Sequence, residues 1–150
     1  MKLKSQSGRS MVEMLGVLAI IGVLSVGGIA GYTLAMRRHR ANGVVDIASK
    51  FILLSYTKCQ KALLDERATT YDQCGEKLIP ESCNFDATGI GTLPVGVSGF
   101  DCPHFHQYDT GVDTVTVSVH FDDDKLCQAV GAINGSGCQY KQSVFTIKQN

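Results

Sequence analysis

The chain has 150 residues, 44% of them hydrophobic, which fits one small domain with an appendage and is too short for two domains with separate cores. Its formal net charge of zero conceals an asymmetry, because residues 1–67 hold ten Lys and Arg against four Asp and Glu, whereas residues 68–150 hold four Lys against ten Asp and Glu. The basic residues flank an apolar segment and the C-terminal part is acidic, so we expect no nucleic-acid binding.

Residues 14–36 form an uncharged run of 23 residues near the start of the chain. As a helix this run would be about 34 Å long, enough to cross a hydrocarbon core of about 30 Å. A secretory signal peptide is the first alternative, since its apolar core of about 7–15 residues ends in small residues, as residues 28–30 do. The run continues beyond them through Tyr32 to Met36. The length therefore favours a membrane-spanning helix that is retained.

One carboxylate, Glu13, stands at the start of the apolar run, and Gly8 precedes it. An ionisable group costs roughly 2.5–3.5 kcal/mol at the centre of a membrane, less near the edge, and usually has a partner. Arg9 lies one helical turn before Glu13, so an interfacial pair between the two is the simplest interpretation.

The stretch GRSMVEMLGVLAIIGVL, residues 8–24, resembles the class III signal of type IV pilins and pseudopilins. The resemblance covers about the first 40 residues and combines the glycine, a four-residue spacer, the glutamate and the apolar run. It implies that residues 1–8 are a leader peptide, that a prepilin peptidase cleaves between Gly8 and Arg9, and that Arg9 is then N-methylated. It also implies that Glu13, as the fifth mature residue, helps to dock each subunit into a filament. The first mature residue is usually apolar in this family, and Arg9 departs from that pattern.

The function that this resemblance implies is that of a structural subunit of a type IV pilus. Such a subunit waits in the inner membrane with its head in the periplasm and then joins an extracellular helical filament of identical copies. The other implied partners are the prepilin peptidase and the assembly platform with its ATPase. A type II secretion pseudopilin is the alternative within the family. A membrane-anchored periplasmic binding module and a secreted disulfide-rich protein or enzyme are alternatives from other classes. The role of the filament, whether adhesion, motility, DNA uptake, conjugation or secretion, stays open.

A helical pattern continues beyond the apolar run, so we expect one helix over residues 10–66, with residues 9–36 as its membrane or filament-core part. Apolar and small residues recur at a spacing of three or four and predict that residues 37–67 pack into the head. This stripe consists of Val44, Ala48, Phe51, Ser55, Cys59 and Ala62. Arg37, Arg38 and Arg40 follow the apolar run and mark the far membrane interface. Local unwinding, if present, is expected at Gly27 and Gly28.

Six cysteines in a small domain that follows a hydrophobic segment predict three disulfides and an oxidising compartment. They are Cys59, Cys74, Cys83, Cys102, Cys127 and Cys138. Fifteen pairings of six cysteines exist, and the sequence does not choose among them. A bond between the last two is locally plausible because a turn lies between them. A bond from Cys59 would join the helix to the head.

Residues 68–150 are expected to form a small disulfide-rich head with three or four antiparallel strands. Residues 114–121 alternate apolar and polar side chains and form the clearest strand, residues 143–147 the last, and residues 93–97 a short edge strand. Residues 68–111 are expected to be rich in loops, as a long connection after the helix that Cys74 and Cys83 hold in place. Residues 122–124 offer an N-cap for a helix over residues 125–132, and residues 134–137 form a turn. The expected fold is therefore α+β, a long helix packed on a small antiparallel sheet, like the ladle of pilins.

Two clusters raise the question of a metal site. Cys102, His104 and His106, with Asp101 and Asp109 nearby, offer zinc-type ligands, but a surface loop with an oxidised cysteine is the favoured interpretation. The acidic residues 122–124 lack the spaced ligands of an EF-hand loop, so capping is favoured over calcium binding. No nucleophile and base stand together in the sequence. We therefore expect no metal, no cofactor and no enzymatic activity.

Overall fold

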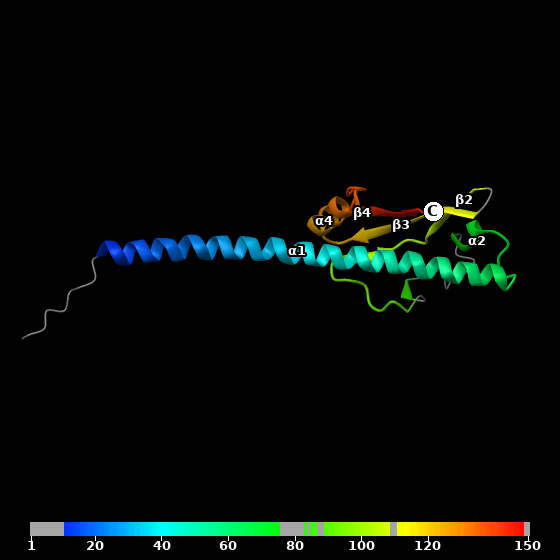
Figure 1. Ribbon diagram of the computed structural model, residues 1–150, viewed down its shortest axis with the longest axis horizontal. Helices are drawn as coiled ribbons and strands as arrows, with labels where there is room; N and C mark the ends of the chain where they lie inside the picture. The colour runs from blue at the N-terminus through cyan, green and yellow to red at the C-terminus, as the bar shows by residue number, and fades with distance from the viewer. Residues whose placement is uncertain (1–10, 76–82, 84, 87–88, 109–110, 149–150) are drawn as a thin grey trace, which may run out of the picture. The chain divides into compact units, whose positions relative to one another are not determined.

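The computed structural model describes residues 11–75, 83, 85–86, 89–108 and 111–148 (Figure 1). The chain divides into two compact units, Met1–Met36 and Arg37–Asn150. The elements are α1 (Met11–Leu64), α2 (Tyr71–Gly75), β1 (Val97–Phe100), β2 (His104–Tyr108), β3 (Gly111–Phe121), α4 (Asp124–Asn134) and β4 (Gln142–Lys148). A long N-terminal helix packed on a small antiparallel sheet confirms the expected α+β fold.

Helix α1 runs without interruption through Gly27 and Gly28, so the single chain shows no unwinding there. It ends close to the expected residue, because Glu66 adopts a left-handed conformation with a φ of 57°. The backbone N–H groups of Arg67 and Ala68 then donate to the carbonyl oxygen of Ala62, at 2.9 and 3.3 Å. These bonds satisfy a carbonyl that the end of the helix would otherwise leave unpaired.

In the second unit, one face of α1 is buried and forms one side of the hydrophobic core. The buried residues of α1 are Ala41, Val44, Ala48, Phe51, Ile52, Ser55, Cys59 and Ala62. This set contains the complete predicted stripe, which is therefore confirmed. Its spacing of three or four residues keeps the buried side chains on one side of the helix. Ser55 is the one polar residue of this buried face of α1. Its hydroxyl is fully buried and has no hydrogen-bond partner within the described residues.

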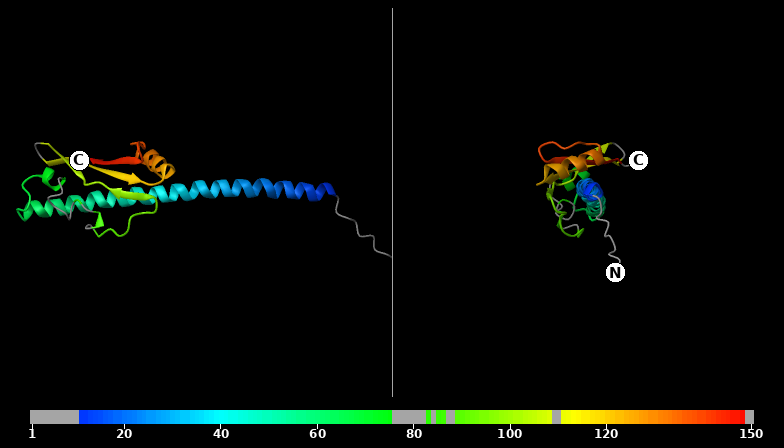
Figure 2. Two further views of the ribbon diagram at one scale, coloured as in Figure 1. Left: turned by 180° about the vertical axis from the view of Figure 1, so that it is seen from behind. Right: turned by 90° about the vertical axis from the view of Figure 1, so that its left-hand side faces the viewer.

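Strand β3 is the centre of the sheet, and the other three strands all pair with it in antiparallel fashion. Strand β4 pairs along one edge of β3 without a shift in register, whereas β2 and β1 share the other edge, each with one irregularity. Both views in Figure 2 show this sheet lying along one side of the second part of α1. Val115, Val117, Val119 and Phe121 are buried between sheet and helix, as their alternation predicted.

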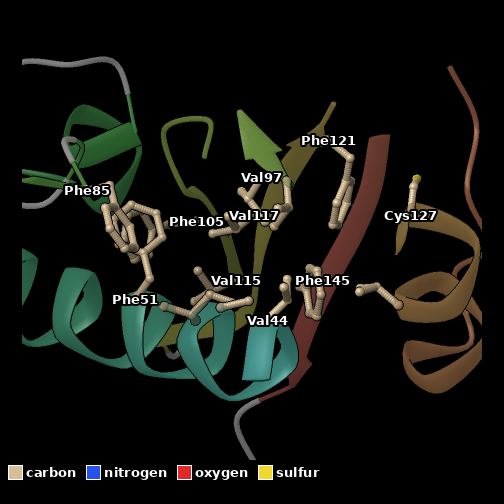
Figure 3. Close-up of a cluster of buried hydrophobic side chains, with 14 of the residues drawn as sticks. Val44, Phe51, Phe85, Val97, Phe105, Val115, Val117, Phe121, Cys127 and Phe145 are labelled. Atoms are coloured by element: carbon tan, nitrogen blue, oxygen red, sulfur yellow. The ribbon is translucent and has the colours of Figure 1, made fainter. Parts of the chain in front are cut away.

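The core continues from α1 through the sheet to the loop that precedes β1 (Figure 3). The ring of Phe51 lies 5.5 Å from that of Phe85 and 5.4 Å from that of Phe100. Phe85 and Phe100 stack on each other at 4.7 Å. Figure 3 shows Val44 near Phe145, so α1 contacts the core along several turns. Aromatic contacts therefore attach the irregular residues before β1 to the long helix.

Two predictions for the region between α1 and β3 are wrong. Residues 93–97 form no strand, because the N–H of Val97 donates to the carbonyl of Pro94 at 3.0 Å and Gly96 has a φ of 90°. This is a turn, and β1 begins only at its last residue. The supposed loop region 68–111 also contains α2 and β2, so His104 and His106 lie on a strand rather than in a surface loop.

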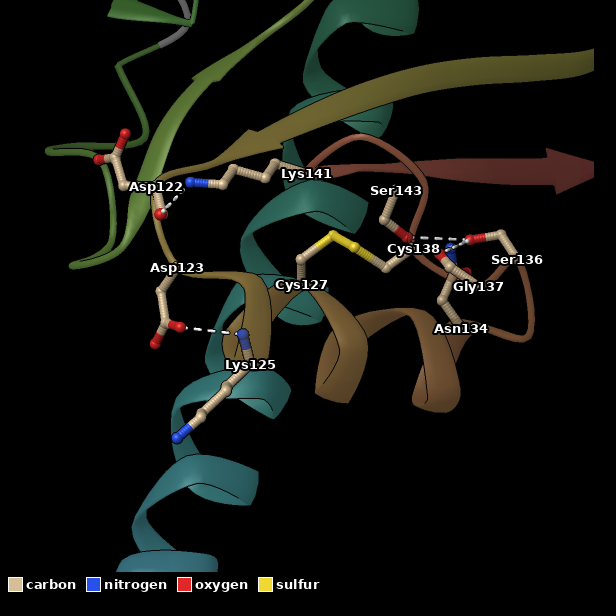
Figure 4. Close-up of a disulfide and its surroundings, with 10 residues drawn as sticks. All are labelled: Asp122, Asp123, Lys125, Cys127, Asn134, Ser136, Gly137, Cys138, Lys141 and Ser143. Carbon is tan, nitrogen blue, oxygen red and sulfur yellow. Dashed lines mark hydrogen bonds between the residues drawn. A yellow bond between two sulfur atoms is a disulfide. The ribbon is translucent and has the colours of Figure 1, made fainter.

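Helix α4 begins at the N-cap region that its sequence predicts (Figure 4) and ends at Asn134, two residues beyond the predicted end. Asp123 is its N-cap, and the carboxylate oxygen Oδ1 accepts a hydrogen bond of 2.9 Å from the N–H of Lys125. Gly135 is its C-cap with a φ of 77°, and its N–H donates to the carbonyl of Gly131. The chain then turns back along α4 so closely that Gly131 has no room for a Cβ.

Candidate functional site

The most distinctive surface of the protein is the first part of α1. Every side chain from residue 11 to residue 35 is exposed in the isolated chain, although most of them are apolar; Leu24 is 68% exposed. The most apolar 18-residue window in α1 has a mean hydropathy of 2.2, and none of it is buried. By length and composition this helix could span a membrane. Such a surface is unfavourable in water and requires an apolar environment.

Glu13 is the one carboxylate of this segment and lies in the first turn of α1. A negative charge there interacts favourably with the helix dipole. The Glu13 side chain is exposed and forms no ion pair within the described part of the chain. Gly8 and Arg9, the predicted cleavage site, lie outside the described residues. The site therefore consists of an exposed apolar helix with a single carboxylate in its first turn.

The glycines of this segment are not required by any close contact in the part of the chain that the structure describes. A Cβ added at Gly16, Gly22, Gly27, Gly28 or Gly31 would meet no atom within 4 Å. Alanine at each position would favour the helix by about 1 kcal/mol. Small residues on a membrane helix allow another backbone to approach closely, and Gly27 and Gly31 have the four-residue spacing typical of such contacts. The glycines thus suit a helix that packs against other helices.

Four consecutive residues after the apolar run form a basic cluster, which we define as Arg37, Arg38, His39 and Arg40. All four lie on α1; Arg37 is half-buried and the other three are exposed. The sequence contains no Asp or Glu from residue 14 to residue 45, so none lies within a helical turn of the cluster. Their exposure leaves Arg38, His39 and Arg40 accessible to groups outside the chain.

The structure pairs all six cysteines in three disulfides, Cys59–Cys74, Cys83–Cys102 and Cys127–Cys138. The first joins α1 to α2, which is the attachment of the helix that the position of Cys59 predicted. The second joins the loop before β1 to the connection between β1 and β2. The third joins α4 to the segment that leads into β4 (Figure 4). Covalent links thus hold each irregular stretch of a small core in place.

The residues considered as metal ligands do not converge. Cys102 is bonded to Cys83, and His104 and His106 are exposed on β2. In the ranges that the structure describes, no group of three or more His, Cys, Asp and Glu side chains lies close enough to hold a metal ion. Asp109 lies outside these ranges. The acidic residues 122–124 supply the α4 N-cap described above.

The hydrogen-bonded pair of His120 and Asp101 was not predicted from the sequence. The Nε2 atom of His120 on β3 lies 2.9 Å from Oδ2 of Asp101, which directly follows β1. The two residues are 19 apart, and only the pairing of β1 with β3 brings them together, so no local signal could have found them. Asp101 also lines an open cavity of about 670 Å³ together with Phe100 and His104. The described lining residues include no serine, threonine or free thiol that could act as a nucleophile.

A second cluster that sequence reasoning missed joins α1, α2 and β2. The rings of Tyr56 and Tyr71 stack at 6.0 Å, and each lies 6.5 Å from the ring of Phe105. Burial raises the pKa of the Tyr56 hydroxyl above its ordinary value, and the neighbouring Tyr71 raises it further. The cluster lies beside the Cys59–Cys74 disulfide in the sequence and stabilises the same end of α1.

Comparisons of the chain with protein-family models, with curated proteins and with solved structures found no match. Fold and site together define a class: a protein with one apolar helix long enough to span a membrane and a disulfide-bonded α+β unit that packs on the continuation of that helix.

Proposed function

We propose that this protein is the structural subunit of a type IV pilus. It is made as a precursor, cleaved between Gly8 and Arg9, N-methylated on Arg9, and polymerised through the first part of α1. The observation that carries the proposal is the exposed apolar helix with one carboxylate, Glu13, in its first turn.

The apolar surface is too large to remain in water. Burial of one Val, Leu, Ile or Met side chain contributes about 1.5–3 kcal/mol, and the exposed large hydrophobic residues of this segment include 12 such side chains before Tyr32. A lipid bilayer and a bundle of identical helices both provide this burial. We infer that the subunit uses the membrane first and the bundle after assembly.

Glu13 favours the bundle as the final environment. A carboxylate that faces lipid is costly and has no counterion there. In a filament, the α-amino group that cleavage creates on Arg9 of a neighbouring copy can form an ion pair with Glu13, and the Arg9 guanidinium is a second donor. A buried charge is tolerated when such a partner is present.

The three disulfides support a head outside the cytoplasm, because structural disulfides form and persist in oxidising compartments. Before assembly the subunit then sits in the inner membrane with residues 37–150 in the periplasm. The prepilin peptidase, the assembly platform and its ATPase act on it there.

The test compares Glu13→Ala with Asp65→Ala, a control that removes an exposed carboxylate directly after the other end of α1. Both are expressed in cells that contain the processing and assembly machinery. We expect both chains to begin at N-methylated Arg9 by mass spectrometry, but only Glu13→Ala to lose filaments by electron microscopy. Filaments at normal yield from Glu13→Ala would refute the role of the carboxylate. A chain that begins at Met1, or near Gly31, would refute the pilin assignment and indicate an anchored or a secreted protein.

A further inference from the structure

The basic cluster is distributed around the circumference of α1, although Arg37, four residues before the buried Ala41, is partly covered. Successive residues of an α-helix are rotated by about 100°, so four consecutive positions cover the whole circumference. Arg38, His39 and Arg40 are exposed, and Arg37 is half-buried. A protein that docked on one side of the helix would meet only one or two of these side chains. A layer of anions that encloses the helix would meet the three exposed side chains and the exposed part of Arg37.

In the part of the chain that the structure describes, no carboxylate forms a salt bridge with the cluster. Among the described residues, the salt bridge of Asp46 with Lys50 and the hydrogen bond of His120 with Asp101 both lie outside the cluster. Arg37 and Arg40 are three residues apart and are therefore neighbours on the helix surface, where two like charges destabilise the helix. An anion from outside the chain would remove this repulsion.

The position of the cluster along α1 specifies where such anions lie. It follows directly on the uncharged residues 14–36, whose helical length of about 34 Å matches a bilayer core. Tyr32 is exposed about one turn earlier, where aromatic side chains are typically found at a membrane interface. The arginines therefore lie at the depth of the lipid headgroups.

We propose that Arg37, Arg38 and Arg40 bind the phosphate groups of anionic phospholipids in the leaflet on the side of the second unit. The planar guanidinium group matches phosphate oxygens with two parallel hydrogen bonds and is always charged. The enclosing geometry favours lipid over a protein partner. The inference requires α1 to span a membrane but does not require the chain to form a filament. If it does form one, these lipid contacts must break when the subunit leaves the bilayer.

The test uses the full chain, purified in mild detergent and titrated with phosphatidylglycerol or phosphatidylcholine of matched acyl chains. Native mass spectrometry measures the ratio of bound lipids. Each arginine near an anionic surface contributes roughly a fivefold preference, so we expect the triple variant R37Q/R38Q/R40Q to lose the preference for phosphatidylglycerol by about a hundredfold. The matched control K61Q/K125Q/K148Q removes the same charge from exposed positions elsewhere. We expect this control to keep the preference for phosphatidylglycerol.

Two further measurements separate the alternatives. Millimolar inorganic phosphate should not displace phosphatidylglycerol from the wild-type chain; complete displacement would overturn the proposal in favour of a simple anion site. If both triple variants lost the preference for phosphatidylglycerol equally, the preference would be an effect of net charge, and the proposal would also be overturned. Wild-type lipid preference in R37Q/R38Q/R40Q, with loss of association between copies, would assign the cluster to a protein partner instead. Unchanged near-ultraviolet circular dichroism verifies that each variant is folded. None of these outcomes depends on filament formation.

Discussion

Replacement of Gly131 by alanine tests how tightly the segment after α4 packs on that helix. A Cβ at this position would lie 2.9 Å from the backbone nitrogen of Cys138 and closer still to the carbonyl group of Gly137. These are backbone atoms, so no rotamer change relieves the overlap. The Cys127–Cys138 disulfide holds the same segment on α4 and limits its retreat. Gly131→Ala should therefore destabilise the second unit, although alanine is the better helix former.

The size of the effect follows from two opposing terms. Overpacking in a tight core costs about 1–3 kcal/mol, and we expect the upper end because only backbone can move. The higher helix propensity of alanine returns about 1 kcal/mol. We expect the free energy of unfolding to fall by about 2 kcal/mol. Gly43→Ala is the matched control, since Gly43 also lies inside a helix but a Cβ there meets nothing within 4 Å. It should stabilise the protein by up to about 1 kcal/mol.

The assay is thermal unfolding of the full chain in detergent, followed by near-ultraviolet circular dichroism of the tyrosines. At roughly 4 °C per kcal/mol for a unit of this size, we expect Tm to fall by about 8 °C for Gly131→Ala and to rise by about 4 °C for Gly43→Ala. Mass spectrometry verifies that the disulfides are intact. Shifts of the same sign, or an unchanged Tm for Gly131→Ala, would refute the close approach of the two segments.

Two further predictions concern a buried and a half-buried residue of α1. Ser55→Ala should raise the free energy of unfolding by about 1 kcal/mol, because it removes a buried hydroxyl without a partner and improves helix propensity. The control is Ser49→Ala, at an exposed serine whose hydroxyl donates to the Val45 carbonyl. In denaturant titrations this control should change the free energy of unfolding by less than about 0.5 kcal/mol. Since burial raises the pKa of Tyr56, the folded state holds this proton more tightly than the unfolded state. Its contribution to stability is complete below about pH 10 and declines as the pH rises further. Tyr56→Phe should reduce the decline of Tm at alkaline pH, and an unchanged decline would contradict this assignment.

The elements that could be predicted are those whose burial repeats regularly along the chain. The stripe on α1 and the alternation in β3 each extend over enough residues to show a period. Strand β2 has only five residues, and its buried Phe105 lies between two exposed histidines. The strand is therefore too short for its alternation to be recognised in the sequence. For residues 93–97 the sequence predicted a strand that does not form. Val95 is a residue type common in strands, but it is 80% exposed and precedes Gly96, which has a positive φ.

The candidate site divides in the same way. An uncharged run with one carboxylate at its start is visible in the sequence, because hydropathy and charge are properties of the residues themselves. Contacts between distant residues are not. The pair of Asp101 and His120 depends on the register of β1 against β3, and the cluster around Tyr56 depends on how α2 and β2 meet α1.

The sequence by itself determined that this protein has an apolar helix of membrane length, a second helical part with one buried face, and cysteines for three disulfides. Only the tertiary structure decided which cysteines are bonded to each other. Cys74 and Cys83 are nearest to each other in the sequence but are not bonded to each other, so the entropy of loop closure alone does not select the pairing. The choice is made when packing brings two Cα atoms within 4.5–5.7 Å, and that distance exists only once α1, the sheet and α4 share a core.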